Sequence, residues 1–211
     1  LTNHDVPSTY YSKKSSNRII PGYEKTLEDN THLLVLFSTI FIEEMDFYDF
    51  INKVKETSQE AVIIMPHPYR TYSGALRNEL HLDQNEILSR IDIVDAIEVI
   101  NGKSTFEENM RAVKLWESHN FDVSAGSDSH NGNMGTVHFS TKIEIIDRNS
   151  FINANSDIRI NYKGTMYQFI SDNVQNTSRK GSLYNDRVLT FYSENKLEVK
   201  SVSDMLYQIG V

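Results

Sequence analysis

The sequence predicts an α/β fold in which short strands, joined by helices, form a parallel sheet or barrel. Three observations predict it: short apolar segments rich in Val and Ile, amphipathic segments between them, and their regular alternation up to about residue 146. Strands that are buried on both faces have this nearly continuous apolar character. Alternation of strands and helices is typical of parallel α/β architectures.

Six segments have the length and composition of buried strands. They are Arg18–Pro21, Leu33–Phe37, Ala61–Met65, Ala96–Ile100, Phe121–Ala125 and Thr136–Thr141. Between the second and third, residues 43–58 are predicted to be helical, because their apolar side chains recur on one face of a helix. Asp83 with Glu86 is expected to open a second helix, and Ser104 with Glu107 forms a predicted capping box for a third.

The composition excludes several classes of protein. The 211 residues include 21 Lys+Arg and 29 Asp+Glu, so the net charge of −8 argues against a general nucleic-acid or anionic-membrane binder. With no cysteine, any metal must be held by His, Asp or Glu. The longest apolar stretch, Leu33–Ile42, is too short to span a bilayer, and we expect no secretory signal because the first residues are polar. We therefore expect no membrane partner and a cytoplasmic location.

Four of the seven histidines lie at the end of a predicted strand or beside one, and two carboxylates lie in similar places. Functional groups collect at the carboxyl ends of strands in parallel α/β folds, so one rim is expected to gather all six. These residues are His4, Glu24, His32, His67, Asp128 and His130.

This set of donors suits divalent metals, because imidazole and carboxylate ligands fit Zn, Mn and Fe. Asp128 and His130 lie two residues apart on a predicted extended loop, so their side chains are expected to point the same way. A single histidine near a strand end is more often a structural residue, and the hypothesis rests on the six occurring together. His81, His119 and His138 are interpreted as structural.

Read in order, the fragments around these residues resemble the PHP (polymerase and histidinol phosphatase) family. The matching fragments are Leu1–His4, Ile20–Glu24, Thr31–Leu33, Met65–Pro68, Asp95–Asn101 and Ala125–His130. The resemblance covers about residues 1–145. It implies a distorted, TIM-like (β/α)7 barrel with two or three divalent ions (Zn, Mn or Fe) at its C-terminal rim, and hydrolysis of phosphate esters. We assign residues 1–164 to such a hydrolase domain and residues 165–211 to an extension, a hairpin plus a short helix, of unknown role.

The resemblance also implies a role for each residue. Glu24 would bridge two metals, and His32 and His67 would complete the ligands of the second metal. Asp128 would bind the first metal. The third metal would be bound by the two remaining imidazoles, those of His4 and His130.

Two features depart from the family pattern. The family's opening His-x-His motif is absent and is expected just upstream of Leu1, so the barrel is expected to be incomplete at its N-terminus. The family usually has Asp where Asn3 stands. Either the full protein supplies the missing strand, or this chain is a truncated or degenerate member.

The expected activity is metal-assisted hydrolysis of a small-molecule or nucleotide phosphomonoester, in which bound ions lower the pKa of water to near 7. Arg70, three residues past His67, is predicted to clamp a phosphate oxygen. The expected partner is a small phosphorylated substrate, and no nucleic acid beyond a short oligonucleotide. The alternatives are a hydrolase of a C–N or carboxylic ester bond, and a non-catalytic module that retains the fold.

Overall fold

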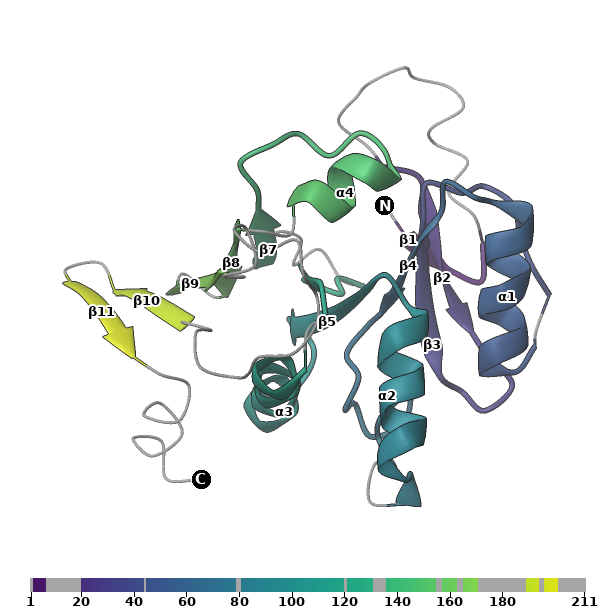
Figure 1. Ribbon diagram of the computed structural model, residues 1–211, viewed down its shortest axis with the longest axis horizontal. Coiled ribbons are helices and arrows are strands. Elements are labelled where there is room, and N and C mark those ends of the chain that lie inside the picture. Colours follow the sequence, from purple (N-terminus) through teal and green to yellow (C-terminus); the bar gives the residue numbers. More distant parts are fainter. Residues whose placement is uncertain are drawn as a thin grey trace.

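The computed structural model describes residues 2–6, 20–43, 45–78, 81–119, 121–130, 136–154 and 157–162, together with the backbone of three later strands. The first sheet contains β1 (Thr2–His4), β2 (Gly22–Thr26), β3 (His32–Leu36), β4 (Val62–Met65), β5 (Ala96–Asn101) and β6 (Val123–Gly126), in that spatial order. The second sheet contains β7 (Val137–Ser140), β8 (Asp157–Tyr162), β9 (Thr165–Ile170), β10 (Leu189–Ser193) and β11 (Lys196–Lys200). The helices of the described residues are α1 (Phe47–Thr57), α2 (Gln84–Ile93), α3 (Phe106–Ser118) and α4 (Arg148–Ala154), as Figure 1 shows.

The first sheet is mixed, with a single reversed strand among those described. β1 runs parallel to β2, and β4, β5 and β6 run parallel to one another, whereas β3 is antiparallel to both of its neighbours. Only residues 27–31 separate β2 from β3. A parallel crossover needs a dozen or more residues, so this short connection dictates a hairpin. All strands of this sheet except β3 therefore point the same way.

The predicted (β/α)7 or TIM-like barrel is wrong, because neither sheet of the described residues closes on itself. β1 and β6 form the two edges of the first sheet, and the strands of the second sheet are all antiparallel. A barrel of this class needs a helical crossover after each strand. β2 and β3 instead form a hairpin, and the strands of the second sheet pair antiparallel, so two open sheets lie side by side (Figure 1).

Most of the predicted elements are found, with two shifts. The first predicted strand is displaced: β2 begins at Gly22, and Glu24 lies within it rather than after it. The capping box of α3 is formed by Thr105 and Glu108, one residue later than predicted. Asp83 caps α2 through the backbone N–H of Glu86, as predicted. β10 and β11 form the hairpin expected in the C-terminal extension, while the short helix expected after it, at residues 201–208, lies outside the described residues.

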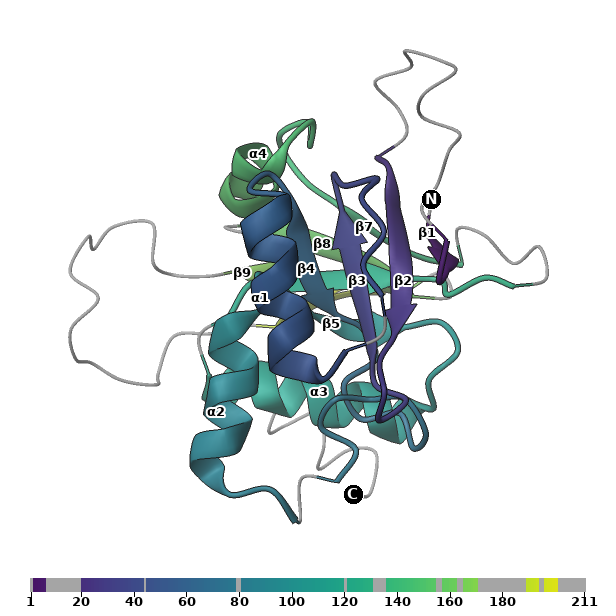
Figure 2. The same cartoon turned by 90° about the vertical axis from the view of Figure 1, so that its right-hand side faces the viewer.

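The core occupies both faces of the first sheet, because side chains alternate along each strand. On one face, Ile63 and its neighbours pack in a cluster that includes Phe50 of α1 and Trp116 of α3. On the other face, Val62 and Ile64 pack with Phe151 of α4. Figure 2 shows α1 in front of the first sheet and α4 near its upper edge. Burying each large apolar side chain contributes about 1.5–3 kcal/mol, so both faces hold the sheet in place.

Among the described residues, no helix combines the length and the apolar character that a membrane span requires.

Candidate metal centre

Polar side chains from several strands gather at one end of the first sheet, where all its strands except β3 finish; we call this end of the strands the site edge. β1 ends at His4, and β4 and β6 end two residues before His67 and Asp128. Because β3 runs in the opposite direction, its first residue, His32, lies at this same edge. The N-terminal end of β3 therefore lies beside the C-terminal ends of the other strands.

The Glu24 carboxylate lies at the centre of this group, and the Glu24 side chain is 10% exposed. Its Oε1 atom lies 2.8 Å from Nδ1 of His32 and 3.3 Å from Nε2 of His67. Its Oε2 atom lies 3.4 Å from Nε2 of His4. Each carboxylate oxygen of Glu24 therefore has at least one imidazole neighbour.

The contacts continue from Glu24 to the loop after β6. Nε2 of His4 lies 3.1 Å from Nε2 of His130, and Nδ1 of His130 lies 3.3 Å from Oδ1 of Asp128. The ring centroids of His4 and His32 are 5.1 Å apart, and those of His32 and His67 are 5.3 Å apart. The six residues singled out in the sequence thus form one continuous series of contacts, which we call the His–carboxylate cluster. Their role as metal ligands stays a prediction.

Two residues of this cluster have left-handed backbone conformations. The φ angle is 30° at His67 and 48° at Asp128. Such angles cost a non-glycine residue about 1–3 kcal/mol and persist only where neighbouring groups hold them. At His67, the backbone N–H donates to Oε2 of Glu98 at 3.0 Å, and the carbonyl accepts from the backbone N–H of Arg70 at 3.0 Å.

The electrostatics of the cluster favour the protonation states that bind metals. Burial opposes ionisation of Glu24, but hydrogen bonds from His32 and His67 and the charge of His4 outweigh it, so the Glu24 pKa lies below its ordinary value. Burial lowers the pKa of His67, although its hydrogen bond to Glu24 acts in the opposite direction. At neutral pH Glu24 is therefore ionised and His67 is neutral, the forms required of a carboxylate and an imidazole ligand.

The His67 ring also carries an unpartnered polar atom. Its side chain is 1% exposed, and no hydrogen-bond partner for Nδ1 is found among the described residues. Buried polar atoms are nearly always satisfied, so an orphaned ring nitrogen calls for an explanation. The unpartnered nitrogen is not the one beside Glu24, because Nε2 makes that contact.

Two buried polar residues beside the cluster were not assigned a role from the sequence. Glu98 and Asn101 are 4% and 1% exposed, and Nδ2 of Asn101 donates to Oε2 of Glu98 at 2.8 Å. Burial raises the Glu98 pKa to about 8, despite the hydrogen bonds from Asn101 and His67. The available signal was a Glu and an Asn within an otherwise apolar strand, β5.

Arg70 contacts the protein through both of its terminal nitrogens. Nη1 donates to Oδ2 of Asp128 and Nη2 donates to Oδ1 of Asn101, each at 2.6 Å. The phosphate-clamp role of Arg70 stays a prediction. The other histidines lie outside the cluster: His81 is exposed, His119 is the C-cap of α3, and His138 lies in β7.

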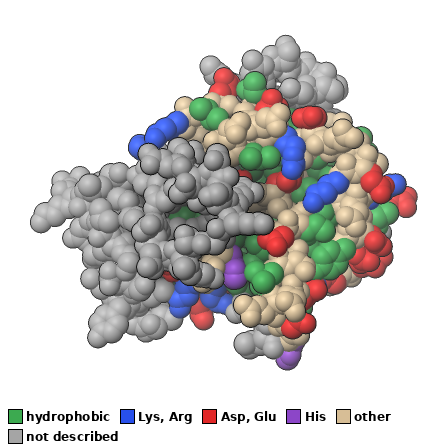
Figure 3. Space-filling view, viewed as in Figure 1, with side chains coloured by type: hydrophobic (Ala, Val, Ile, Leu, Met, Phe, Trp, Pro, Cys, Tyr) green, Lys and Arg blue, Asp and Glu red, His purple; other side chains and the backbone are tan. Residues whose placement is uncertain are grey.

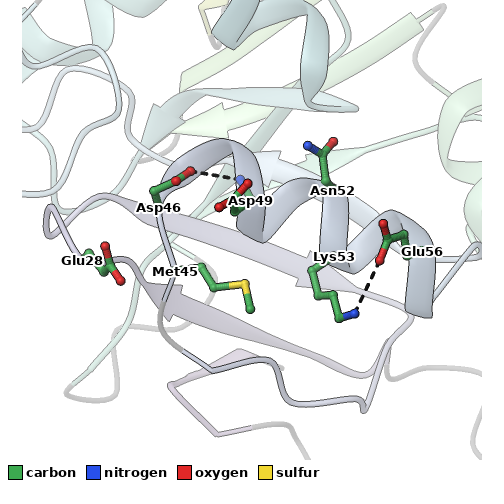
Figure 4. Close-up of a pocket in the computed structure, with 7 residues that line it drawn as sticks. All are labelled: Glu28, Met45, Asp46, Asp49, Asn52, Lys53 and Glu56. Carbon is green, nitrogen blue, oxygen red and sulfur yellow. Dashed lines mark hydrogen bonds and ion pairs between the residues drawn. The ribbon is translucent and has the colours of Figure 1, made fainter.

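A cavity of about 610 Å³ lies elsewhere, beside α1 (Figure 4). It is lined by Glu28, Met45, Asp46, Asp49, Asn52, Lys53 and Glu56, and no residue of the His–carboxylate cluster lines it. Two of its four acidic residues are engaged in local contacts: Asp46 caps α1, and Glu56 pairs with Lys53 at 3.4 Å. On the face drawn in Figure 3, acidic, basic and apolar side chains of the described residues are interspersed.

Comparisons with known proteins give a fold-level likeness. No protein-family model matches the chain. An uncharacterized protein of Methanocaldococcus jannaschii is 30% identical over 118 residues, which cover 54% of this chain and 47% of that protein. The chain therefore spans less than half the length of this curated relative.

A solved structure from Bacteroides vulgatus resembles the chain with a TM-score of 0.53 and 15% sequence identity. That structure is a two-domain protein containing a predicted PHP-like metal-dependent phosphoesterase. The likeness covers 90% of this chain and 65% of that one. At such low identity the likeness concerns the fold alone.

Proposed function

We propose that this chain is a metal-dependent hydrolase of phosphate esters, acting on phosphomonoesters of small molecules or nucleotides at a site of two or three divalent ions. The observation that carries the proposal is the His–carboxylate cluster, in which four imidazoles and two carboxylates share one edge of a sheet. The fold-level likeness to a protein containing a predicted PHP-like metal-dependent phosphoesterase supports it.

The donors fit a metal ion in chemistry and spacing. One ligand atom from each of His4, Glu24 and His32 lies within 4.8 Å of the other two. Ligands bound to Zn at about 2.1 Å in a tetrahedron lie about 3.4 Å apart, so side-chain movements of about 1 Å bring these atoms to bonding positions. His67 approaches the same Glu24 oxygen as His32, with its Nε2 atom 3.3 Å from Oε1.

Glu24 is the residue best suited to a shared position between two ions. Its two oxygens face different imidazoles, Oε1 toward His32 and His67 and Oε2 toward His4. A carboxylate with imidazoles beside both of its oxygens is suited to a position shared by two metal ions. Asp128 and His130 form the other end of the cluster, as ligands of the remaining ions.

When bound, divalent ions of the Zn, Mn or Fe type lower the pKa of bound water toward neutrality and offset charge on phosphoryl oxygens. The chain's own residues prepare this chemistry. The ionised Glu24 supplies negative charge, and neutral His67 keeps a lone pair available. Glu98, through the His67 backbone N–H, holds that residue in its left-handed conformation.

The test compares hydrolysis by the chain with Mn²⁺, Zn²⁺ or Fe²⁺ and with EDTA. The substrates are p-nitrophenyl phosphate, p-nitrophenyl acetate and an anilide. We expect metal-dependent release of phosphate that His67→Ala and Asp128→Ala each abolish, since both residues are proposed ligands. His81→Ala is the matched control, because this exposed histidine lies outside the cluster.

Three outcomes would contradict the proposal. Undiminished turnover in His67→Ala or Asp128→Ala would remove the cluster from the chemistry. Hydrolysis of the acetate or anilide but not of the phosphate would favour a C–N or ester hydrolase. No bound ion and no hydrolysis would favour a non-catalytic module.

A further inference from the structure

We propose that Arg70 is a positioning residue for Asp128, and that the buried pair Asn101 and Glu98 holds Arg70 in place. The inference rests on the proposed function, because it concerns groups around the same site. In this proposal Arg70 does not bind the substrate phosphate but orients the Asp128 carboxylate.

The guanidinium of Arg70 bridges two separate elements. Nη1 contacts Oδ2 of Asp128 in the loop after β6, and Nη2 contacts Oδ1 of Asn101 at the end of β5, each at 2.6 Å. The Asp128 side chain is 8% exposed and that of Arg70 is 21% exposed, so water screens the pair weakly. With Oδ2 held by Arg70, the other oxygen of Asp128 faces Nδ1 of His130 at 3.3 Å. Arg70 thereby fixes the rotation of the Asp128 carboxylate, with one oxygen toward His130.

Both the backbone and the side chain of Asn101 are held by hydrogen bonds. The side chain of Asn109 donates to its carbonyl at 3.1 Å and accepts from its backbone N–H at 2.9 Å. Besides Arg70, Oδ1 of Asn101 accepts from the backbone N–H groups of Lys103 and Ser104, at 2.8 and 3.1 Å. An amide with so many partners cannot rotate without breaking several hydrogen bonds. It therefore offers Arg70 an acceptor in a fixed position.

Glu98 connects this network to the other side of the site. Its Oε2 atom accepts from Nδ2 of Asn101 at 2.8 Å and from the backbone N–H of His67 at 3.0 Å. A Cβ added to Gly126 would lie 2.6 Å from Oε1 of Glu98, so this carboxyl also abuts the end of β6. One buried side chain thus touches the ends of β4, β5 and β6. The network explains why a carboxyl is kept inside an apolar strand.

The positioning and clamp roles predict opposite changes on substitution. If Arg70 orients Asp128, its loss weakens metal binding in the absence of substrate and leaves KM nearly unchanged at saturating metal. If Arg70 clamps phosphate, its loss raises KM and spares metal binding. Simple charge repulsion predicts a third result, tighter binding of the cation once Arg70 is removed. The directions in which Mn²⁺ affinity and KM change therefore distinguish the three explanations.

The experiment titrates the full chain with Mn²⁺ alone, by calorimetry, for the wild type, Arg70→Lys, Arg70→Ala, Asn101→Ala and the double variant of Arg70→Ala with Asn101→Ala. We expect each single variant to weaken Mn²⁺ binding by roughly 10- to 100-fold, as loss of groups that orient metal ligands commonly does. The double variant should bind like Arg70→Ala, because Asn101 acts through Arg70. Lys103→Ala is the matched control: it removes a neighbouring exposed charge but keeps the backbone N–H that contacts Asn101.

Arg70→Lys keeps the inference falsifiable if Asn101→Ala does not fold, since it retains the charge at a partly exposed position and loses only the two-nitrogen bridge. Wild-type binding with equal or tighter binding in both Arg70 variants would overturn the inference and leave the proposed function standing. A tenfold rise in KM with unchanged Mn²⁺ affinity would also overturn it, in favour of the clamp. If the wild type binds none of Mn²⁺, Zn²⁺ and Fe²⁺, the proposed function itself is refuted, and this inference with it.

Discussion

The buried carboxyl of Glu98 makes the stability of the metal-free protein depend on pH, and Glu98→Gln isolates that dependence. Burial raises the pKa of Glu98 from an ordinary value of 4.5 to about 8. Between these two values the folded protein retains a proton that the unfolded chain has released. The free energy of unfolding therefore falls as pH rises from about 4.5 to 8 and levels off above that.

The size of the effect follows from the shift. Each pKa unit corresponds to about 1.4 kcal/mol, so a rise from 4.5 to about 8 corresponds to at most about 5 kcal/mol. Glutamine has nearly the same shape and stays neutral throughout, so the variant lacks this contribution. The carbonyl oxygen of its amide can still accept from the His67 backbone N–H.

The assay is urea denaturation in EDTA at half-unit intervals from pH 5 to 8.5, followed by fluorescence of Trp116, the chain's single tryptophan, which is 2% exposed. All other titrating groups are common to the two proteins and cancel in the difference. We expect the variant to gain several kcal/mol on the wild type as pH rises from 5 to 8. A difference that stays constant with pH would show that Glu98 does not retain its proton in the folded state, and the reasoning would fail.

Three further predictions concern single contacts. Gly126→Ala should destabilise the fold by about 1–3 kcal/mol, because the new Cβ would lie 2.6 Å from Glu98 Oε1; an unchanged Tm would contradict this. Arg148→Ala should lower the free energy of unfolding by about 3 kcal/mol in urea denaturation, because the Asp95 side chain, 10% exposed, loses its cation and keeps the backbone N–H of Ile63 as a partner; a loss under 1 kcal/mol would argue against this. Glu24→Gln should lower phosphate release more than His130→Ala does, because both oxygens of Glu24 face imidazoles. Equal or greater activity loss in His130→Ala would count against a shared position for Glu24.

Local signals in the sequence were sufficient for several elements. The N-cap of α2 at Asp83 depends on a hydrogen bond to a residue three positions away, so the sequence reveals it directly. The cap of α3 shows the limit of such signals. Ser104 and Thr105 each have a Glu three residues later, and a tertiary contact decides between them: the backbone N–H of Ser104 donates to Asn101, which keeps Ser104 in the loop.

The error in fold class has a specific origin. The first strand was predicted at 18–21, whereas β2 occupies Gly22–Thr26. That displacement concealed how short the connection to β3 is, and with it the hairpin that reverses β3. Strand direction is a property of pairing between segments, which the composition of a single strand does not encode.

The sequence alone determined which metal-ligating side chains are available, that none of them is a cysteine, and in what order they occur along the chain. The strand ends of an α/β fold then bring such donors to one edge, which made the six residues of the cluster predictable. Tertiary structure alone decided that the sheets stay open and that Arg70 contacts Asp128 and Asn101, which are 58 and 31 residues away. Contacts over such separations depend on strand register and loop conformation, which the whole packed core determines together.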